Sequence, residues 1–98
     1  MGNRKASSRT LTPVVYRIQF TPSAEREFLK LPTLLQGRLD LKIGALARTP
    51  RPAGVVKLAG QEAYRIRVGD YRVVYEIHDR VLVVLVLTVG HRGDVYRR

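Results

Sequence analysis

The chain has 98 residues, a formal net charge of +10 and no cysteine. Its length suits one domain with a single apolar core, and the lack of cysteine excludes disulfides and thiolate metal sites and favours a reducing, cytoplasmic compartment. The positive charge favours a polyanionic partner, above all nucleic acid, with a basic surface that serves only solubility as the alternative.

The N-terminal segment differs in composition from the rest of the chain. Residues 1–13 are polar, rich in Ser, Thr and Arg, and closed by Pro13, so we expect a disordered arm before one folded domain at residues 14–98. The arm lacks the apolar segment of a signal peptide. The longest apolar stretch, residues 81–89, is too short to cross a bilayer, so we expect a soluble protein without a membrane partner.

The domain begins with a strand followed by a helical hairpin. Apolar and polar side chains alternate through residues 14–20, which is typical of a strand with one buried face. Thr21 can cap a helix and Pro22 suits its first position, so a helix starts there. Pro32 interrupts it, and a second helix is expected over residues 33–47. The side chains expected to face the core from the two helices are Ala24, Phe28, Leu31, Leu35, Leu39, Ile43 and Leu46.

After the helices the apolar pattern has a period of two, which indicates an antiparallel sheet. Residues 64–77 form a predicted hairpin around Gly69 and Asp70, whose composition suits a two-residue turn. A second turn near Asp79 leads into residues 81–89, which are apolar on both faces and therefore predict a central strand. The predicted fold is α+β, β-α-α-β-β-β, with the N-terminal helical hairpin packed on a small antiparallel sheet.

The hairpin register places like charges opposite each other. Arg67 faces Arg72 across the two strands, and Arg65 lies two residues along the same outer face, away from the core. Like charges paired across a sheet are destabilising, so the cluster indicates a bound anion such as a phosphate. The alternative is a solvated strand face on which the arginines spread apart or pair with Glu62 or Glu76.

The tail after Val89 brings further reactive side chains toward this cluster. It leaves the strand expected beside the second hairpin strand, and it carries His91, Arg92 and Tyr96. Arginines bind a scissile phosphate, while a histidine or tyrosine exchanges protons with the attacking 2′-hydroxyl or the leaving 5′-oxygen, so the set suits RNA cleavage. The alternatives are a solvated His91 and a Tyr96 that closes the core or stacks on a base.

We expect neither a metal nor a cofactor. His78 and His91 are the only histidines, and no pair of acidic residues has a spacing that suits a two-metal site. A glycine-rich phosphate loop of the Walker type is also missing from the sequence.

Three segments together resemble the RelE toxin family of bacterial type II toxin-antitoxin systems. They are "YRIQFTPSAEREFLKLP", "VKLAGQEAYRIRVGDYRVVYEI" and "VLTVGHRGDVYRR", and the resemblance covers residues 14–98. Its most specific pieces are "KLAG", "YRIRVGDYRVVYEI" and "HRGDVYRR".

The resemblance implies a ribosome-dependent mRNA interferase that inhibits translation through 2′-hydroxyl attack on the scissile phosphate. It implies a metal-independent endoribonuclease in the cytoplasm, with the ribosome, mRNA and a cognate RelB-like antitoxin as partners and with oligomers formed through the antitoxin. The catalytic residues it implies are Arg65, Arg67, Arg72, Arg92 and Tyr96, to which we add His91 as a secondary contact and Arg97 and Arg98 as RNA contacts.

Two positions depart from the family pattern. The best-known members of the family carry lysine where this chain has Arg65 and Arg67. An arginine cannot act as a base near neutral pH, so proton transfer must pass to Tyr96, to His91 or to a ribosomal group. We favour Tyr96, because the resemblance implies a functional tyrosine at this position and neighbouring guanidinium groups would lower its pKa.

Two other functions fit the same sequence. The sibling ParE toxins share the fold and inhibit DNA gyrase, but they generally lack the full catalytic set that Arg72, Arg92 and Tyr96 represent here. A nucleic-acid-binding or autoregulatory domain without catalysis would also be basic, and it would not require Tyr96 or His91.

Overall fold

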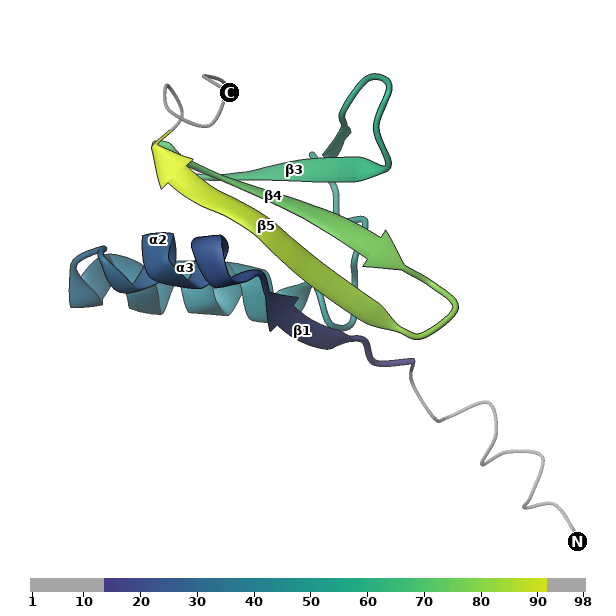
Figure 1. Cartoon of the computed structure of the whole chain (residues 1–98), viewed down its shortest axis with the longest axis horizontal. Helices are drawn as coiled ribbons and strands as arrows, with labels where there is room; N and C mark the ends of the chain where they lie inside the picture. The colour runs from purple at the N-terminus through teal and green to yellow at the C-terminus, as the bar shows by residue number, and fades with distance from the viewer. Residues whose placement is uncertain (1–13, 92–98) are drawn as a thin grey trace, which may run out of the picture.

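The computed structural model describes residues 14–91, which form two helices on one face of a five-stranded sheet (Figure 1). The elements are β1 (Arg17–Phe20), α2 (Pro22–Leu29), α3 (Thr33–Ala45), β2 (Val56–Lys57), β3 (Ala63–Val68), β4 (Tyr71–His78) and β5 (Val83–His91). The α+β class and the order of the expected elements are confirmed, with β2 as an additional short strand. Neither helix within the described residues is long and apolar enough to span a membrane.

The strands lie in the order β1-β5-β4-β3-β2, so β5 is internal, as its apolar side chains on both faces predict. Three of the four strand pairs are antiparallel, but β1 pairs with β5 in parallel, which the expected antiparallel sheet did not include. The long connection from β1 through two helices and a hairpin makes this pairing possible, because parallel neighbours need a crossover rather than a tight turn.

The helices begin where the sequence predicts. The Thr21 side chain accepts a hydrogen bond from the Ala24 backbone N–H at 3.1 Å, and Pro22 is the first residue of α2. From α3, Leu39 and Ile43 are buried against the sheet, and Leu46 follows at the end of the helix. Burial of these side chains against β3, β4 and β5 forms the single core.

β5 is displaced from its predicted position at residues 81–89. It begins at Val83 because Leu82 has a positive φ of 56°, and the Leu82 carbonyl accepts a hydrogen bond from the Arg17 backbone N–H at 2.8 Å. It continues beyond Val89 to His91, where the sequence predicts a tail. Gly90 and His91 are therefore placed by strand geometry.

A β-bulge interrupts the pairing of β4 with β5. Val74 pairs with Thr88 and Tyr75 pairs with Val86, so Leu87 is an extra residue on β5. Side chains alternate between the faces of a strand, and the extra residue restarts that alternation. Val86 and Val89 consequently both belong to the core, although they are three residues apart.

Candidate functional site

The β3–β4 hairpin carries the expected arginine cluster. Gly69 has a positive φ of 60° at the first central position of the turn, which is typical of a type II′ hairpin turn. Arg67 pairs with Arg72 as predicted, and Arg65 pairs with Val74. The residues that alternate with them belong to the core under the helices, so the three arginines occupy the opposite face of the sheet. We call Arg65, Arg67 and Arg72 the arginine face.

The three arginines differ in burial. Arg67 is exposed and Arg65 is half-buried, but Arg72 retains only 6% of its accessible surface. Arg72 lies on the outer face as expected, but it is a buried side chain with a contact inside the protein. Its neighbours across the sheet are Arg67 on one side and Gly90, which has no side chain, on the other. A buried guanidinium needs polar contacts to offset its lost hydration. The position of the Arg72 side chain is therefore more restricted than that of the exposed Arg67.

The two carboxylates that could neutralise these arginines each contact another cation. Glu62 lies 3.7 Å from the Lys57 ammonium, and a Glu76 oxygen lies 2.8 Å from His78 Nε2. Arg65 and Arg72 each keep a contact within the protein, and Arg67 is the exposed cation of the arginine face.

His91 does not join the arginine face. It pairs with Tyr71, and the two rings meet edge to face with centroids 5.6 Å apart. Tyr71 packs against the core on the helix side of the sheet, so His91 lies on that side as well. The expected convergence with the arginine cluster does not occur for His91, because β5 continues through this residue. The remaining predicted site residues lie outside the described part of the chain; they are Arg92, Tyr96, Arg97 and Arg98.

Glu27 anchors the end of β5 to the first helix. Its carboxylate accepts a hydrogen bond from the Val89 backbone N–H at 2.9 Å. β1 pairs with β5 only as far as Val86, so the helix side chain provides the acceptor that a longer β1 would have supplied. This contact was not predicted, because the two residues are 62 positions apart.

Sequence reasoning also missed a polar network at the far end of the sheet. Asp79 accepts hydrogen bonds from the Tyr16 hydroxyl at 2.6 Å and from Arg51 at 3.0 Å, and the Arg51 guanidinium lies 5.5 Å from the centre of the Tyr64 ring. The bond from Arg51 holds the pKa of Asp79 below its ordinary value, while the bond to Asp79 raises the pKa of Tyr16. We call Tyr16, Arg51, Asp79 and Tyr64 the Asp79 network.

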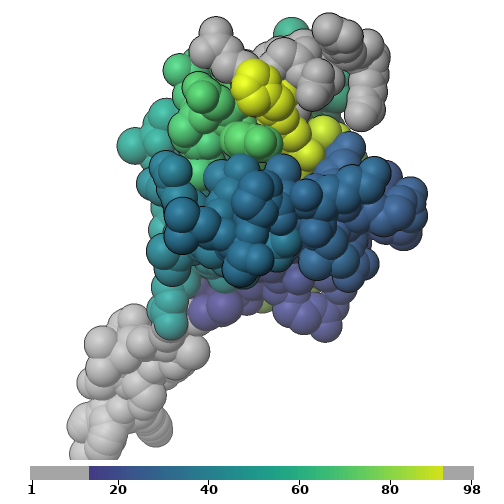
Figure 2. Space-filling view, turned by 90° about the vertical axis from the view of Figure 1, so that its left-hand side faces the viewer, coloured from purple at the N-terminus to yellow at the C-terminus, as the bar shows by residue number. Residues whose placement is uncertain are grey.

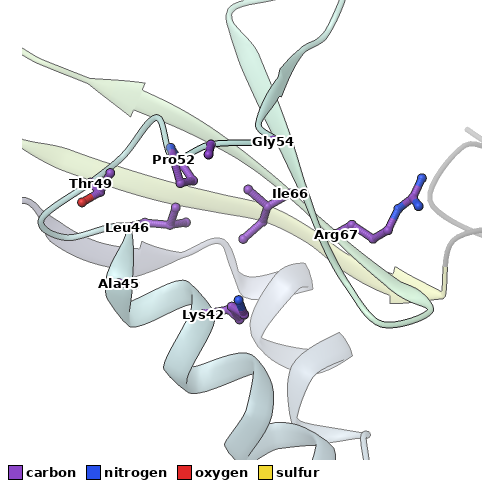
Figure 3. A pocket seen from close by; sticks show the side chains of 9 residues that line it. Lys42, Ala45, Leu46, Thr49, Pro52, Gly54, Ile66 and Arg67 are labelled. Carbon is purple, nitrogen blue, oxygen red and sulfur yellow. The ribbon is translucent and has the colours of Figure 1, made fainter.

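A groove that the sequence did not indicate runs between α3 and β3. A hollow of about 310 Å³ has Leu46, Ile66 and Pro52 in its lining, with Lys42 and Arg67 at its edge (Figure 3). An adjoining hollow lies toward the β3–β4 turn and is lined by Arg38, Leu41, Lys42, Arg67, Val68 and Gly69. We call the two together the α3–β3 groove. Within residues 14–91, no three acidic or histidine side chains lie close enough together to hold a metal ion.

Comparison with known proteins gives matches over most of the chain. A family model described as the ParE toxin of the type II toxin-antitoxin system parDE matches residues 18–96. Toxin RelG of Mycobacterium tuberculosis is 38% identical over 87 residues, which cover 85% of this chain and 98% of RelG. The mRNA interferase toxin RelE of Escherichia coli is 32% identical over 88 residues, which cover 85% of this chain and 92% of RelE.

The same likeness extends to solved structures. The crystal structure of the archaeal RelE-RelB complex from Pyrococcus horikoshii OT3 contains a chain that matches this one with a TM-score of 0.72 and 29% identity. The match covers 81% of this chain and 97% of the archaeal chain. The arrangement of two helices on a mixed sheet is therefore shared with RelE structures.

Proposed function

The chain belongs to the RelE/ParE family of type II toxin-antitoxin toxins, and from this premise we propose that it is a ribosome-dependent mRNA interferase. One relative is named an mRNA interferase and shares 32% of its residues with this chain. The observation that carries the proposal is the arginine face, where Arg67 lies directly opposite Arg72. A sheet surface built in this way favours a bound phosphate.

The proposed reaction needs no metal and proceeds by transesterification. The 2′-hydroxyl loses its proton and its oxygen forms a bond to phosphorus, while the bond from phosphorus to the 5′-oxygen breaks. The 5′-oxygen takes up a proton from solvent, and a 2′,3′-cyclic phosphate results. Arg67 and Arg72 bind the phosphate and stabilise the charge that develops on its oxygens, and Arg65 and Arg92 extend this contact. Arg97 and Arg98 bind the flanking RNA backbone.

Proton transfer is the role we propose for Tyr96. It would take the proton from the 2′-hydroxyl, and surrounding guanidinium groups would lower its pKa toward the range needed. His91 retains at most an indirect role in this proposal, because its ring packs on Tyr71 on the helix side of the sheet. Neither Arg65 nor Arg67 can act as a base at neutral pH.

We propose a RelB-like antitoxin as the regulatory partner. The similar archaeal chain was solved in a complex with RelB. A net charge of +10 favours a partner segment of negative charge and makes their association fast and sensitive to salt. The toxin would then form oligomers through its antitoxin and act in the cytoplasm, where ribosomes and mRNA are found.

Toeprinting on a purified translation system tests the proposal. Wild-type protein should cleave messenger within codons on the ribosome, and the double variant Arg72→Ala with Arg92→Ala should neither cleave messenger nor inhibit growth. Because Arg72 is buried, thermal unfolding of the variant must accompany the assay, and the exposed Arg67→Ala provides a second variant that does not disturb packing.

Inhibition of DNA gyrase is the second candidate function, because the matching family model is described as a ParE toxin. DNA breaks that depend on gyrase, together with intact messenger, would establish this function instead. Absence of both effects would leave a nucleic-acid-binding or autoregulatory domain.

A further inference from the structure

Three cationic side chains from two elements line the α3–β3 groove. Lys42 from α3 and Arg67 from β3 line both of its hollows. Arg38, one helical turn before Lys42, reaches the β3–β4 turn, where its Nη2 atom lies 3.8 Å from the point at which a Cβ on Gly69 would stand. In Figure 2 the blue surface of α3 crosses the front of the molecule, with the green β3–β4 turn above it.

No acidic side chain in the described part of the chain forms an ion pair with these three cations. The ion pairs found there join Arg51 to Asp79, Lys57 to Glu62 and His78 to Glu76. Asp70 stands in the turn itself but forms no ion pair there, and Asp40 lines a different hollow beside Phe20 and Phe28. Three positive charges that line one groove without an ion pair make its potential positive, so the groove favours an external anion.

The floor of the groove is apolar and open to a ligand. β2 pairs with β3 only as far as Arg65, and Gly54, with a φ of 86°, takes the chain away from the edge of β3. The space left between this loop and α3 is floored by Leu46 and Ile66 (Figure 3). An apolar floor with a cationic rim suits a ligand that combines a flat apolar ring with an anionic group.

Arg67 connects the groove to the arginine face. It belongs to both, and its guanidinium group points away from Ile66 and the hollow (Figure 3). A polyanion bound across Arg67 and Arg72 would therefore continue past the edge of β3 onto Arg38 and Lys42. RNA has both required groups in every nucleotide, a base and a phosphate, whereas an acidic peptide has no repeated ring.

We propose that the α3–β3 groove binds the RNA strand where it leaves the arginine face, with Arg38 and Lys42 on phosphates and a base or sugar over the apolar floor. This proposal rests on the proposed function, since it takes RNA as the ligand of the arginine face. Arg38 and Lys42 are positioning residues: they hold the strand and take no part in the reaction. Phosphate contacts of this kind contribute affinity that depends on salt and not on base sequence.

The test is the salt dependence of RNA binding by the full chain. An uncleavable single-stranded 2′-O-methyl RNA is titrated by fluorescence anisotropy with wild type, with Arg38→Gln plus Lys42→Gln, and with Arg26→Gln as the control. Arg26 is an exposed arginine on α2 and does not line the groove, so its loss changes only net charge. Each lost phosphate contact should reduce the slope of log K against log salt by about 0.7, so the double variant should lose about 1.4 and the control should keep the wild-type slope.

Three results would overturn the proposal. They are a wild type that does not bind the RNA, a double variant with the wild-type slope, and a control that loses as much slope as the double variant. An oligoglutamate peptide is titrated in parallel; if the double variant weakens only peptide binding, the groove is a docking surface for protein instead. Cleavage of messenger on ribosomes is measured separately. If the wild type does not cleave messenger but the double variant has a reduced salt slope, the interferase proposal fails and the groove proposal stands.

Discussion

The two ends of the β3–β4 hairpin use charge in opposite ways. At the turn, Arg67 faces Arg72, and two like charges share one surface. At the other end, Asp79 accepts hydrogen bonds from Tyr16 and Arg51. The Asp79 network pairs opposite charges, whereas the arginine face places two like charges side by side, where we propose that a phosphate binds. This difference supports a role of the Asp79 end in stabilising the fold and a role of the turn end in binding the proposed ligand.

The largest effect is expected at the arginine face. Arg67→Ala should lower the single-turnover rate of messenger cleavage about a hundredfold, because one donor to the developing phosphate charge is lost. Stability should change by no more than about 0.5 kcal/mol, because the side chain is exposed. Arg80→Ala, an exposed arginine in the β4–β5 turn, is the control for net charge. If Arg67→Ala lowers the free energy of unfolding enough to explain the lower rate, the turn end also stabilises the fold and the contrast between the two ends is wrong.

The assignment of the proton-transfer residue gives the next largest effect. Tyr96→Phe should lose at least about tenfold in single-turnover rate, since general acid or base catalysis contributes a hundredfold or more. His91→Gln should keep most of the rate, because His91 lies on the helix side against Tyr71. Rates measured across pH check both variants, and a collapsed rate for His91→Gln beside an unchanged rate for Tyr96→Phe would reverse the assignment.

A moderate effect, on stability alone, is expected from a substitution of Tyr75, which lies on β4 between the two ends. Tyr75 is buried, which raises its pKa to about 12, and its hydroxyl donates a hydrogen bond to the Pro50 carbonyl at 2.7 Å. Tyr75→Phe should lower the free energy of unfolding by about 1 kcal/mol, the usual contribution of such a bond. Urea denaturation measures this loss. The cleavage rate should stay at the wild-type value, and a lower rate would mean that this region also shapes the site.

The smallest effect is the pH dependence of the Asp79 network. Folding lowers the pKa of Asp79, so its contribution to stability is present above the unfolded pKa of about 3.9 and is lost as the pH falls through the folded value. Asp79→Asn should therefore be less stable than wild type at neutral pH, and the difference should shrink below about pH 4. Thermal unfolding at a series of pH values measures the difference. A constant difference from pH 7 to pH 2 would show that the charge of Asp79 is not what matters.

Local signals in the sequence predicted the parts of the fold that depend on neighbouring residues. Gly69 and Asp70 determine the turn, and the turn determines that Arg67 faces Arg72, so this part of the site was predictable. Thr21 and Pro22 likewise predicted where α2 begins. In each case the physical cause lies within a few residues along the chain.

Other features depend on contacts between distant segments and could not be read in this way. Tyr16 and Asp79 are 63 residues apart, and no local pattern links them. The burial of Arg72 is not visible in the alternation of β4, which places this side chain on the outer face. The side of the sheet that His91 occupies follows from where β5 ends, and a shift of two residues in that end changed the expected site.

The β-bulge at Leu87 determines which residue of β5 stands opposite Arg72. If β4 and β5 paired without it, Val89 would stand opposite Arg72 and Thr88 would turn into the core. Because of the extra residue, side chains alternate independently before and after the bulge. The first half of β5 pairs with β1, and the second half places Gly90 opposite Arg72. Gain or loss of one residue here would exchange the neighbour of Arg72 while the pairing with β1 stayed intact. In this chain, a single insertion or deletion at the bulge would therefore change the surroundings of Arg72 without rebuilding the fold.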